Sequence, residues 1–245
     1  MKNYKFLICY DGTRYYGWQR QPDQNTIQGK LESVLSVMTG RELEVIGAGR
    51  TDGGVHAKGM VANANLETDL SCEEIRDYMN RYLPDDIAVL DVKEASPRFH
   101  ARYNAIGKTY CYTCYDGDVK SVFDRKYVTR LDEKPDVELM QQASKILLGE
   151  HDFRNFCVNP RMKKSTVRKV DRIDIARDGG YITFTVHGTG FLQNMVRIIV
   201  GTLLEIGCGR MTEAQLAAVL ENPDRQKAGP TAPAQGLCMM SVDYD

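Results

Sequence analysis

Hydrophobic positions in the first half of the chain switch between the two-residue period of strands and the helical period. Apolar residues recur at helical spacing from Ile27 to Met38 and from Ile75 to Tyr82. Gly40 supplies a stop for the first helix, and Ser71 with Glu74 forms a capping box before the second. Strands are predicted around these helices over Phe6 to Tyr10, Leu43 to Ile46, Met60 to Leu66 and Ile87 to Val92. The first half is therefore predicted to be βαββαβ.

The same order of elements returns from Gly107. Strands are predicted over Lys108 to Tyr115, Val167 to Ile175, Tyr181 to His187 and Leu237 to Val242. Helices are predicted over 136–148, over 192–206 and after Thr212, and Asp178-Gly179-Gly180 has the composition of a turn between two strands. The second half is predicted to be βαββααβ.

This repeated pattern predicts an α+β fold of two tandem ferredoxin-like (RRM-like) βαββαβ units. The expected boundaries are 1–105 for an N-terminal domain and 106–245 for a C-terminal domain. Each unit would have an antiparallel sheet with helices on one face. The other sheet face, or a cleft between the units, would then be open to a ligand.

Composition places the chain among ordinary globular proteins. It has 245 residues, of which 42% are hydrophobic and 27% charged. No apolar run approaches the roughly 20 residues of a membrane helix, and the first residues lack the apolar core of a signal peptide. Seven scattered cysteines do not form the framework of a small secreted domain. We therefore expect a cytoplasmic protein with reduced thiols and no membrane association.

Charge neither indicates nor excludes a nucleic-acid partner. The formal net charge is −1, so an RNA site would depend on local clustering of cations. One such cluster carries Phe153, Asn155 and Phe156 among its cations, which are Arg154, Arg161, Lys163, Lys164, Arg168, Lys169 and Arg172. An RNA surface and an ordinary solvated face both fit this run.

The densest group of candidate chemistry is the loop Gly49-Arg50-Thr51-Asp52-Gly53-Gly54-Val55-His56-Ala57. Its glycines permit unusual backbone angles and close approach of another chain segment or a ligand. Asp52 before a glycine is typical of a simple turn, but Arg50 and His56 in the same loop could hold a carboxylate ionised and oriented, as a nucleophile requires. For His56 itself, a hydrogen-bonded structural role is favoured over an acid–base pair with Asp52.

Other candidates come from the second half. Cys111 and Cys114 have C-x-x-C spacing, but residues three apart on a strand point to opposite faces and no second pair completes a metal site. Tyr110 shares a strand face with Tyr112, where packing and base stacking are both possible roles. Arg197 lies in an apolar helix and needs a partner, for which an ion pair within its own domain is one option.

Taken together, several segments resemble the bacterial tRNA pseudouridine synthase A family over nearly the whole chain. They are Tyr10-Asp11-Gly12-Thr13, Gly17-Trp18-Gln19, the loop around Asp52, Phe99-His100-Ala101-Arg102, Lys108-Thr109-Tyr110-Cys111-Tyr112 and Met195-Val196-Arg197. The combination is specific, although each segment alone is weak. Gly53 stands where the family pattern leads us to expect alanine, and Met60 where we expect glutamine; neither change removes a reacting group.

The resemblance implies a cofactor-free, metal-free homodimer that converts uridines 38, 39 and 40 in the tRNA anticodon stem-loop to pseudouridine. Asp52 would be the nucleophile, attacking C1′ or removing the C2′ proton of a flipped nucleotide. By the same resemblance, Tyr110 stacks on the base and helps remove the C5 proton, Arg197 pairs with Asp52, and Arg50 contacts RNA.

Two alternatives from other classes remain at this point. A non-catalytic RNA-binding or tRNA-folding protein could use the tandem sheets as a platform, and it would not need the carboxylate of Asp52. A thiol-dependent redox enzyme would depend on Cys111 and Cys114. Replacing both cysteines with serine would then abolish function, and we expect no loss.

Overall fold

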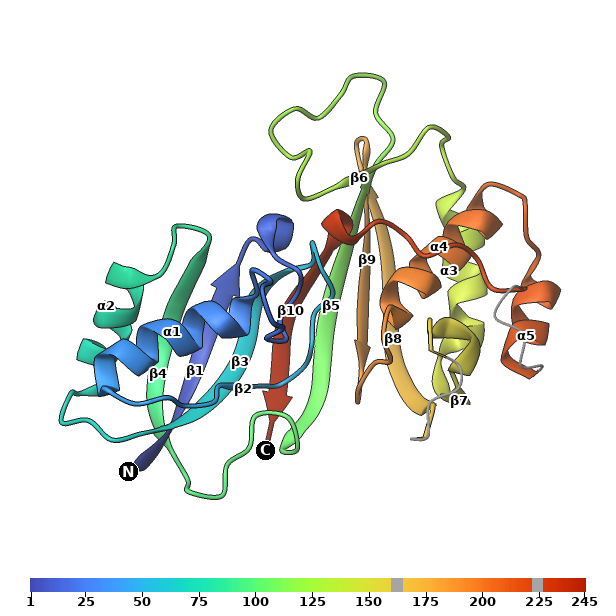
Figure 1. The fold of residues 1–245 in the computed structure, drawn as a ribbon. Coiled ribbons are helices and arrows are strands. Elements are labelled where there is room, and N and C mark those ends of the chain that lie inside the picture. The colour runs from blue at the N-terminus through green and yellow to red at the C-terminus, as the bar shows by residue number, and fades with distance from the viewer. Residues whose placement is uncertain (160–164, 222–226) are drawn as a thin grey trace. The chain divides into compact units, whose positions relative to one another are not determined.

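The computed structural model describes residues 1–159, 165–221 and 227–245 and has a mixed α and β architecture (Figure 1). The chain splits into two compact units. The first contains Met1–Ile106 together with Cys238–Asp245, and the second contains Gly107–Leu237. No helix of the described residues is both long and apolar enough to cross a membrane.

The first unit is a sheet with two helices on one face (Figure 1). The strands β1 (Lys2–Tyr10), β3 (His56–Leu66) and β4 (Ile87–Ala95) lie in the order β4-β1-β3, and both pairings are antiparallel. The short strand β2 (Ile46–Gly47) pairs with β3, as does the start of β10 (Leu237–Tyr244), which runs parallel to it. The helices are α1 (Ile27–Thr39) and α2 (Cys72–Tyr82).

Local signals account for the helix ends in this unit. Thr26 caps α1 by accepting a hydrogen bond from the N–H of Gly29, and Gly40 ends it in the left-handed conformation with φ 69°. Ser71 and Glu74 form both halves of the predicted capping box at α2. The two helices and their bounds were thus predictable from a few residues.

A buried polar network holds the segment after β4. The side-chain amide of Asn3 donates to the carbonyl oxygens of Ser96 and Phe99, at 2.9 and 2.8 Å. Asn63 donates to the Asn3 side chain at 3.0 Å and accepts from the N–H of Ala101 at 2.8 Å. Both asparagines are buried, and the network satisfies their polar atoms while ordering the segment that contains Phe99-His100-Ala101-Arg102.

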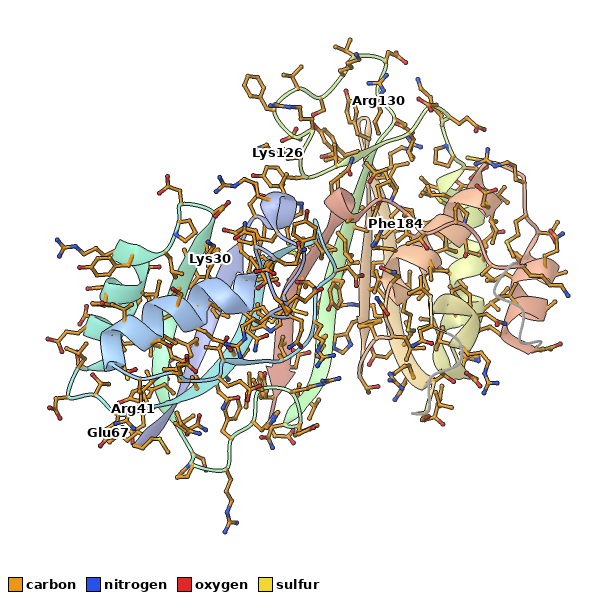
Figure 2. The ribbon with its side chains drawn as sticks, viewed as in Figure 1. Lys30, Arg41, Glu67, Lys126, Arg130 and Phe184 are labelled. Atoms are coloured by element: carbon orange, nitrogen blue, oxygen red, sulfur yellow. The ribbon has the colours of Figure 1, made fainter. Side chains whose placement is uncertain are left out.

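The second unit has its own sheet and its own helices. The strands β5 (Ala105–Tyr115), β9 (Tyr181–Gly188), β8 (Val167–Asp178) and β7 (Gly149–Asp152) lie in that order, and the short strand β6 (Thr129–Arg130) runs parallel to β5. The helices are α3 (Val137–Ser144), α4 (Met195–Gly207) and α5 (Glu213–Glu221). Helix α3 packs on β8 and α4, and the fully buried Phe184 of β9 contributes to the core (Figure 2).

Several features of this fold differ from the sequence prediction. The strand predicted from Leu43 is reduced to Ile46–Gly47, and the strands β6 and β7 were not predicted. The helix predicted to extend to residue 148 ends at Ser144, and a 3₁₀ turn, Lys145–Leu147, separates it from β7. The final strand pairs with β3, so Cys238–Asp245 belongs to the first unit and not, as expected, to the C-terminal one. Strand pairing over such a separation depends on tertiary packing, which periodicity does not encode.

The basic run of the second unit is only partly the surface that was considered. Phe153, Asn155 and Phe156 are buried, at 0%, 2% and 0% exposure, so these two rings are core residues and cannot stack on RNA bases. Arg154 pairs with Asp152 at 2.9 Å. Arg161, Lys163 and Lys164 lie outside the described residues. The interleaved aromatic residues thus give no support to an RNA surface here.

Candidate active site

Asp52 lies in the loop that connects β2 to β3. The carbonyl oxygen of Asp52 accepts from the N–H of Val55 at 3.2 Å, which closes a four-residue turn through Gly53 and Gly54. Gly54 has φ 78°, a value that favours glycine. The side chain of Asp52 is half-buried and that of Arg50 is exposed. The predicted turn is therefore present, and it leaves the carboxylate at the edge of solvent.

A second segment clamps this turn from both sides. The N–H of Trp18 donates to the carbonyl oxygen of Thr51 at 3.0 Å, and the N–H of Gly54 donates to that of Tyr15 at 3.2 Å. Gly17 has φ 95°, and a Cβ built on it would lie 2.5 Å from the Thr51 oxygen. The close approach of the two backbones requires glycine at this position. Asp52 is thus flanked by two hydrogen bonds from one neighbouring segment.

His56 has a structural contact of the kind that was favoured. Its side chain is 5% exposed, and its Nδ1 accepts from the N–H of Gly12 at 3.0 Å. An Asp11 carboxylate oxygen lies 3.2 Å from the same Nδ1 and accepts from the N–H of Thr13 at 2.9 Å. His56 is thus held from the loop formed by residues 11–13.

Tyr110 and Tyr112 lie on the same face of β5, and both are buried. Tyr110 is 8% exposed and meets the ring of Phe191 edge-on, with centroids 5.3 Å apart. Tyr112 is fully buried; its hydroxyl donates to the Pro233 carbonyl oxygen at 2.8 Å and contacts the Thr129 hydroxyl at 2.6 Å. Burial raises the pKa of Tyr112, which stays protonated. Packing is therefore the role that the structure gives Tyr112.

Arg197 projects from the first turn of α4. Its Nε donates to the Ala232 carbonyl oxygen at 2.6 Å, and one terminal nitrogen donates to the Asn194 side-chain oxygen at 2.8 Å. The N–H of Ala232 returns a hydrogen bond to the Arg197 carbonyl oxygen at 3.1 Å. These contacts hold the guanidinium in one orientation.

The four candidate residues thus fall into two pairs. Asp52 and Arg50 lie in one loop of the first unit, while Tyr110 and Arg197 lie in the second unit. Each pair is held by its own unit: the first by the clamped turn, the second by a β5 strand position and by the contacts with Asn194 and Ala232. Within the described residues, no group of three or more histidine, cysteine, aspartate or glutamate side chains is placed to hold a metal ion.

Comparison with known proteins decides the family. A family model described as tRNA pseudouridine synthase matches residues 7–104 and 143–245. A protein named tRNA pseudouridine synthase A from Bacillus sp. (strain KSM-64) is 46% identical over 245 residues, which is the whole of both chains. One named tRNA pseudouridine synthase A 2 from Bacillus cereus (strain ATCC 14579) is 44% identical, again over the whole of both chains. The chain belongs to the tRNA pseudouridine synthase family. It is an isomerase.

A solved structure shows a more distant likeness to this synthase. A chain from the crystal structure of a Cbf5-Nop10-Gar1 complex aligns with a TM-score of 0.36 and 16% identity. The alignment covers 82% of this chain and 45% of that one. A score this low carries no argument about fold or function.

The structure accommodates both residues that depart from the family pattern, Gly53 and Met60. A Cβ at Gly53 would meet the Tyr15 carbonyl oxygen at 3.5 Å, which is ordinary van der Waals contact, so glycine is not required there. Met60 is fully buried in β3, where it pairs with Ile8. A glutamine at that position would bury an amide that needs hydrogen-bond partners.

The thiols of the C-x-x-C pair are unsuited to redox or metal chemistry. In the pairing of β5 with β9, Cys111 lies opposite Thr185 and Cys114 lies opposite Ile182. Of these two cysteines, only Cys114 is fully buried. Burial raises the pKa of Cys114 to about 12, so its thiol stays protonated at neutral pH. A metal ligand or nucleophile would have to be a thiolate.

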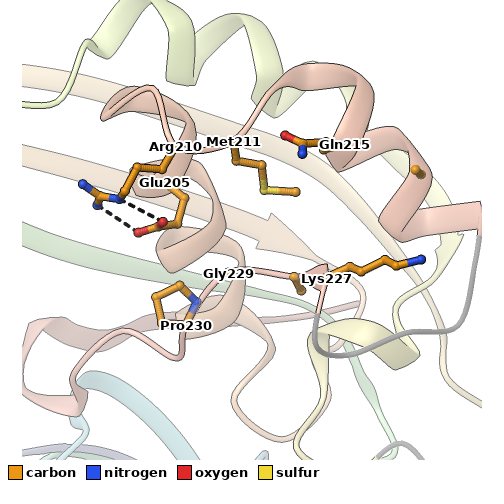
Figure 3. A pocket seen from close by; sticks show the side chains of 9 residues that line it. Glu205, Arg210, Met211, Gln215, Lys227, Gly229 and Pro230 are labelled. Carbon is orange, nitrogen blue, oxygen red and sulfur yellow. Dashed lines mark hydrogen bonds and ion pairs between the residues drawn. The ribbon is translucent and has the colours of Figure 1, made fainter.

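The synthase also has an open pocket apart from these residues, of about 490 Å³, in the second unit (Figure 3). It lies between the end of α4, helix α5 and the segment 227–230, and includes none of the four candidate residues. Arg210 and Glu205 on its wall form two hydrogen bonds of 2.9 Å, so part of its charge is neutralised internally.

Sequence reasoning missed three residues that position the candidate site. Tyr10 and Thr51 share a buried hydroxyl contact of 2.8 Å beside Asp52. Asn194, which holds Arg197, adopts a left-handed conformation with φ 62° directly before α4. An asparagine before an apolar helix was a usable signal, because asparagine is favoured at caps and tolerates that conformation. The Tyr10–Thr51 contact joins residues 41 apart and had no local signal.

Proposed function

We propose that this synthase isomerises uridine to pseudouridine at positions 38, 39 and 40 of the tRNA anticodon stem-loop, with the Asp52 carboxylate as nucleophile. The observation that carries the proposal is the clamped turn: hydrogen bonds from Trp18 and Gly54 fix the backbone on both sides of a half-buried carboxylate. Such fixed orientation is what a nucleophile needs to meet its target at a productive angle.

The reaction is redox-neutral and can proceed with the chain's own groups. The N1–C1′ bond of uridine breaks, the uracil turns, and C5 of the same base forms a bond to C1′; C5 loses its proton and N1 gains one. Asp52 starts this sequence in one of two ways, after the nucleotide has left its stack. If Asp52 attacks C1′, its ester bond to C1′ breaks as C5 attaches; if it removes the C2′ proton, it returns that proton after C5 has attached. No cofactor or metal is part of the proposed reaction.

The other candidates take supporting roles in the proposal. Tyr110 stacks on the flipped uracil and assists loss of the C5 proton, Arg197 pairs with Asp52, and Arg50 contacts the RNA backbone. The exposed guanidinium of Arg50 and the hydrogen bonds that orient the guanidinium of Arg197 support these roles. The proposal requires all four to act on one nucleotide, as in the cleft expected from the sequence.

We also infer ferredoxin-like topology for the domain that carries the Asp52 loop and for the domain that carries Tyr110 and Arg197. The order β4-β1-β3 with β2 against β3, and the order β5-β9-β8, support this topology. A cytoplasmic homodimer is part of the same proposal. Sedimentation of the purified protein tests the dimer, since a monomer at micromolar concentration contradicts it.

The deciding experiment replaces Asp52 with asparagine and maps pseudouridine in tRNA from a deletion strain by the alkali-resistant adduct that pseudouridine forms with a carbodiimide. Wild type should restore the modification, and Asp52→Asn should bind tRNA as wild type does and form none. Modification at the wild-type rate by Asp52→Asn would overturn the mechanism. If the protein were instead a non-catalytic tRNA-folding protein, neither wild type nor Asp52→Asn would give tRNA with the pseudouridine adduct. Both would restore tRNA folding equally.

A matched control keeps the readout specific. Asp69 is an exposed carboxylate of the same unit, outside the clamped loop. Asp69→Asn makes the same change of charge and should modify tRNA at the wild-type rate. Loss of activity in both variants would point to net charge instead of to the position of Asp52.

A further inference from the structure

A long loop, residues 116–128, leaves the end of β5 and returns to β6 (Figure 1). It carries the most exposed large apolar side chain among the described residues, Phe123, at 93%. Val119 and Val122 are also exposed, at 76% and 59%. An aromatic ring held almost entirely in solvent lacks the stabilisation that burial would provide. Such an exposed apolar group is typical of a surface that binds a partner.

The loop is held in shape by hydrogen bonds, although its tip is exposed. Both Ser121 and Tyr181 donate their hydroxyls to one carboxylate oxygen of Asp124, at 2.8 and 2.7 Å. The Asp124 carbonyl oxygen accepts from the N–H groups of Tyr127 and Val128, at 2.7 and 3.1 Å. Because Tyr181 belongs to β9, these bonds fasten the loop to the sheet. Phe123 is therefore presented on an ordered support next to its anchor, Asp124.

The charged side chains around Phe123 favour a polyanion. Lys120, Arg125 and Lys126 are exposed; Lys126 is seen on this loop and Arg130 at its return to β6 (Figure 2). One Arg125 nitrogen donates to the neutral Val122 carbonyl oxygen at 2.6 Å, which orients the guanidinium and leaves its charge intact. The three carboxylates of the loop all have partners. Asp124 accepts from Ser121 and Tyr181, Asp118 forms an ion pair with Lys134 at 3.1 Å, and Asp116 forms one with Arg177 at 2.7 Å.

We propose that the loop 116–128 is an RNA-contacting element, in which Phe123 stacks on an unpaired base of the substrate and Lys120, Arg125 and Lys126 contact the neighbouring phosphates. An aromatic ring among cations is the combination that binds single-stranded nucleic acid, because every base has a face to stack and every linkage carries a negative charge. The proposal rests on the proposed function and adds a substrate contact outside the four candidate residues.

A second copy of the chain is a weaker occupant for this loop. Interfaces between protein copies are depleted in lysine at their centre, and three cations around one ring would have to be neutralised or desolvated there. RNA supplies the opposite charge and the stacking partner together.

The test measures binding of an unmodified tRNA transcript in the Asp52→Asn background, where no turnover occurs. Phe123→Ala should weaken the affinity about tenfold, the scale of one base–aromatic stack, and Phe123→Trp should restore it. Replacing Arg125 and Lys126 together with alanine should weaken binding and lower the slope of log affinity against log salt by about one to two units.

Tyr82→Ala is the matched control. Tyr82 is a 56% exposed aromatic residue on α2 with the Arg81 guanidinium 5.9 Å from its ring centre, so it has similar chemistry outside the loop. Its replacement should leave tRNA affinity unchanged. An equal loss in Tyr82→Ala and Phe123→Ala would overturn the assignment of the contact to this loop.

The Phe123→Trp variant gives a direct signal. The chain has one tryptophan, Trp18, which is 2% exposed, so the fluorescence difference between the variant and its parent reports position 123. Stacking on a base should quench this difference signal and shield it from acrylamide when tRNA is added. Unchanged quenching by acrylamide would contradict stacking.

The outcomes separate this proposal from the proposed function. Absence of pseudouridine formation by wild type would overturn the function itself. Normal modification with unchanged tRNA affinity in Phe123→Ala would overturn the loop proposal alone. A lower oligomer mass for Phe123→Ala, with unchanged tRNA affinity, would identify the loop as an interface between copies and would also overturn it.

Discussion

The hydroxyls of Tyr10 and Thr51 lie 2.8 Å apart in the interior of the first unit, where the two residues are 5% and 6% exposed. Tyr10 ends β1, and Thr51 directly precedes Asp52. The contact therefore ties the residue before the proposed nucleophile to the central part of the sheet. A carboxylate at the edge of solvent gains its fixed position from a buried neighbour.

Removing this contact should affect both stability and turnover. Tyr10→Phe deletes one hydroxyl and leaves that of Thr51 without this partner, which should lower the free energy of unfolding by about 1 to 3 kcal/mol. The rate of pseudouridine formation should fall, while tRNA affinity changes little. Urea unfolding and single-turnover kinetics measure the two effects. Thr51→Ser keeps the hydroxyl and should stay close to wild type; equal damage in both variants would contradict a role for the hydrogen bond.

Two glycines of the clamped turn should respond in opposite ways to alanine. Gly17→Ala places a Cβ 2.5 Å from the Thr51 carbonyl oxygen at φ 95°, so it should destabilise the protein by more than about 1 kcal/mol and reduce activity. Gly53→Ala meets only ordinary contacts and should raise the free energy of unfolding by about 0.4 to 1 kcal/mol, with activity retained. Thermal and urea unfolding check both; a destabilised Gly53→Ala would contradict the geometry of the turn.

Asn194 should act as a positioning residue for Arg197. Asn194→Ala loses the 2.8 Å hydrogen bond to the guanidinium and places alanine at φ 62°, whereas Asn194→Gly loses only the hydrogen bond. Both variants should lower kcat with a small change in KM, and only the alanine variant should also lose about 1 kcal/mol of stability. Steady-state kinetics with urea unfolding separate the two effects. Wild-type kcat in Asn194→Gly would show that this hydrogen bond does not position Arg197 for the reaction.

Cys114 should make stability fall at alkaline pH. Its pKa rises from 9.0 to about 12 because the thiol is buried, so the unfolded state loses this proton at lower pH than the folded state. The stabilisation is complete below pH 9 and is lost as the pH rises from 9 toward 12. Cys114→Ala should make the decline shallower by up to about 1.4 kcal/mol per pH unit. Urea unfolding from pH 8 to 11 measures this, and identical slopes would contradict it.

Much of the local structure was determined by the sequence alone. The capping box of Ser71 and Glu74 and the stop at Gly40 predicted two helix ends, because caps satisfy backbone groups within a few residues. The turn at Gly179 between β8 and β9 was also predicted, because glycine readily adopts the positive φ that such turns require. The loop around Asp52 was singled out by its own residues, and only its combination with distant segments indicated a family.

The tertiary structure decided what depends on residues far apart in the chain. It placed the final strand beside β3, buried the rings of Phe153 and Phe156, and brought Trp18 and Tyr15 to the two sides of Asp52. Periodicity cannot state which apolar run pairs with which, or whether an aromatic residue among cations faces the core or RNA, because burial is a property of the packed chain. Among the aromatic residues next to cations, packing left Phe123 in solvent, where it can meet a substrate.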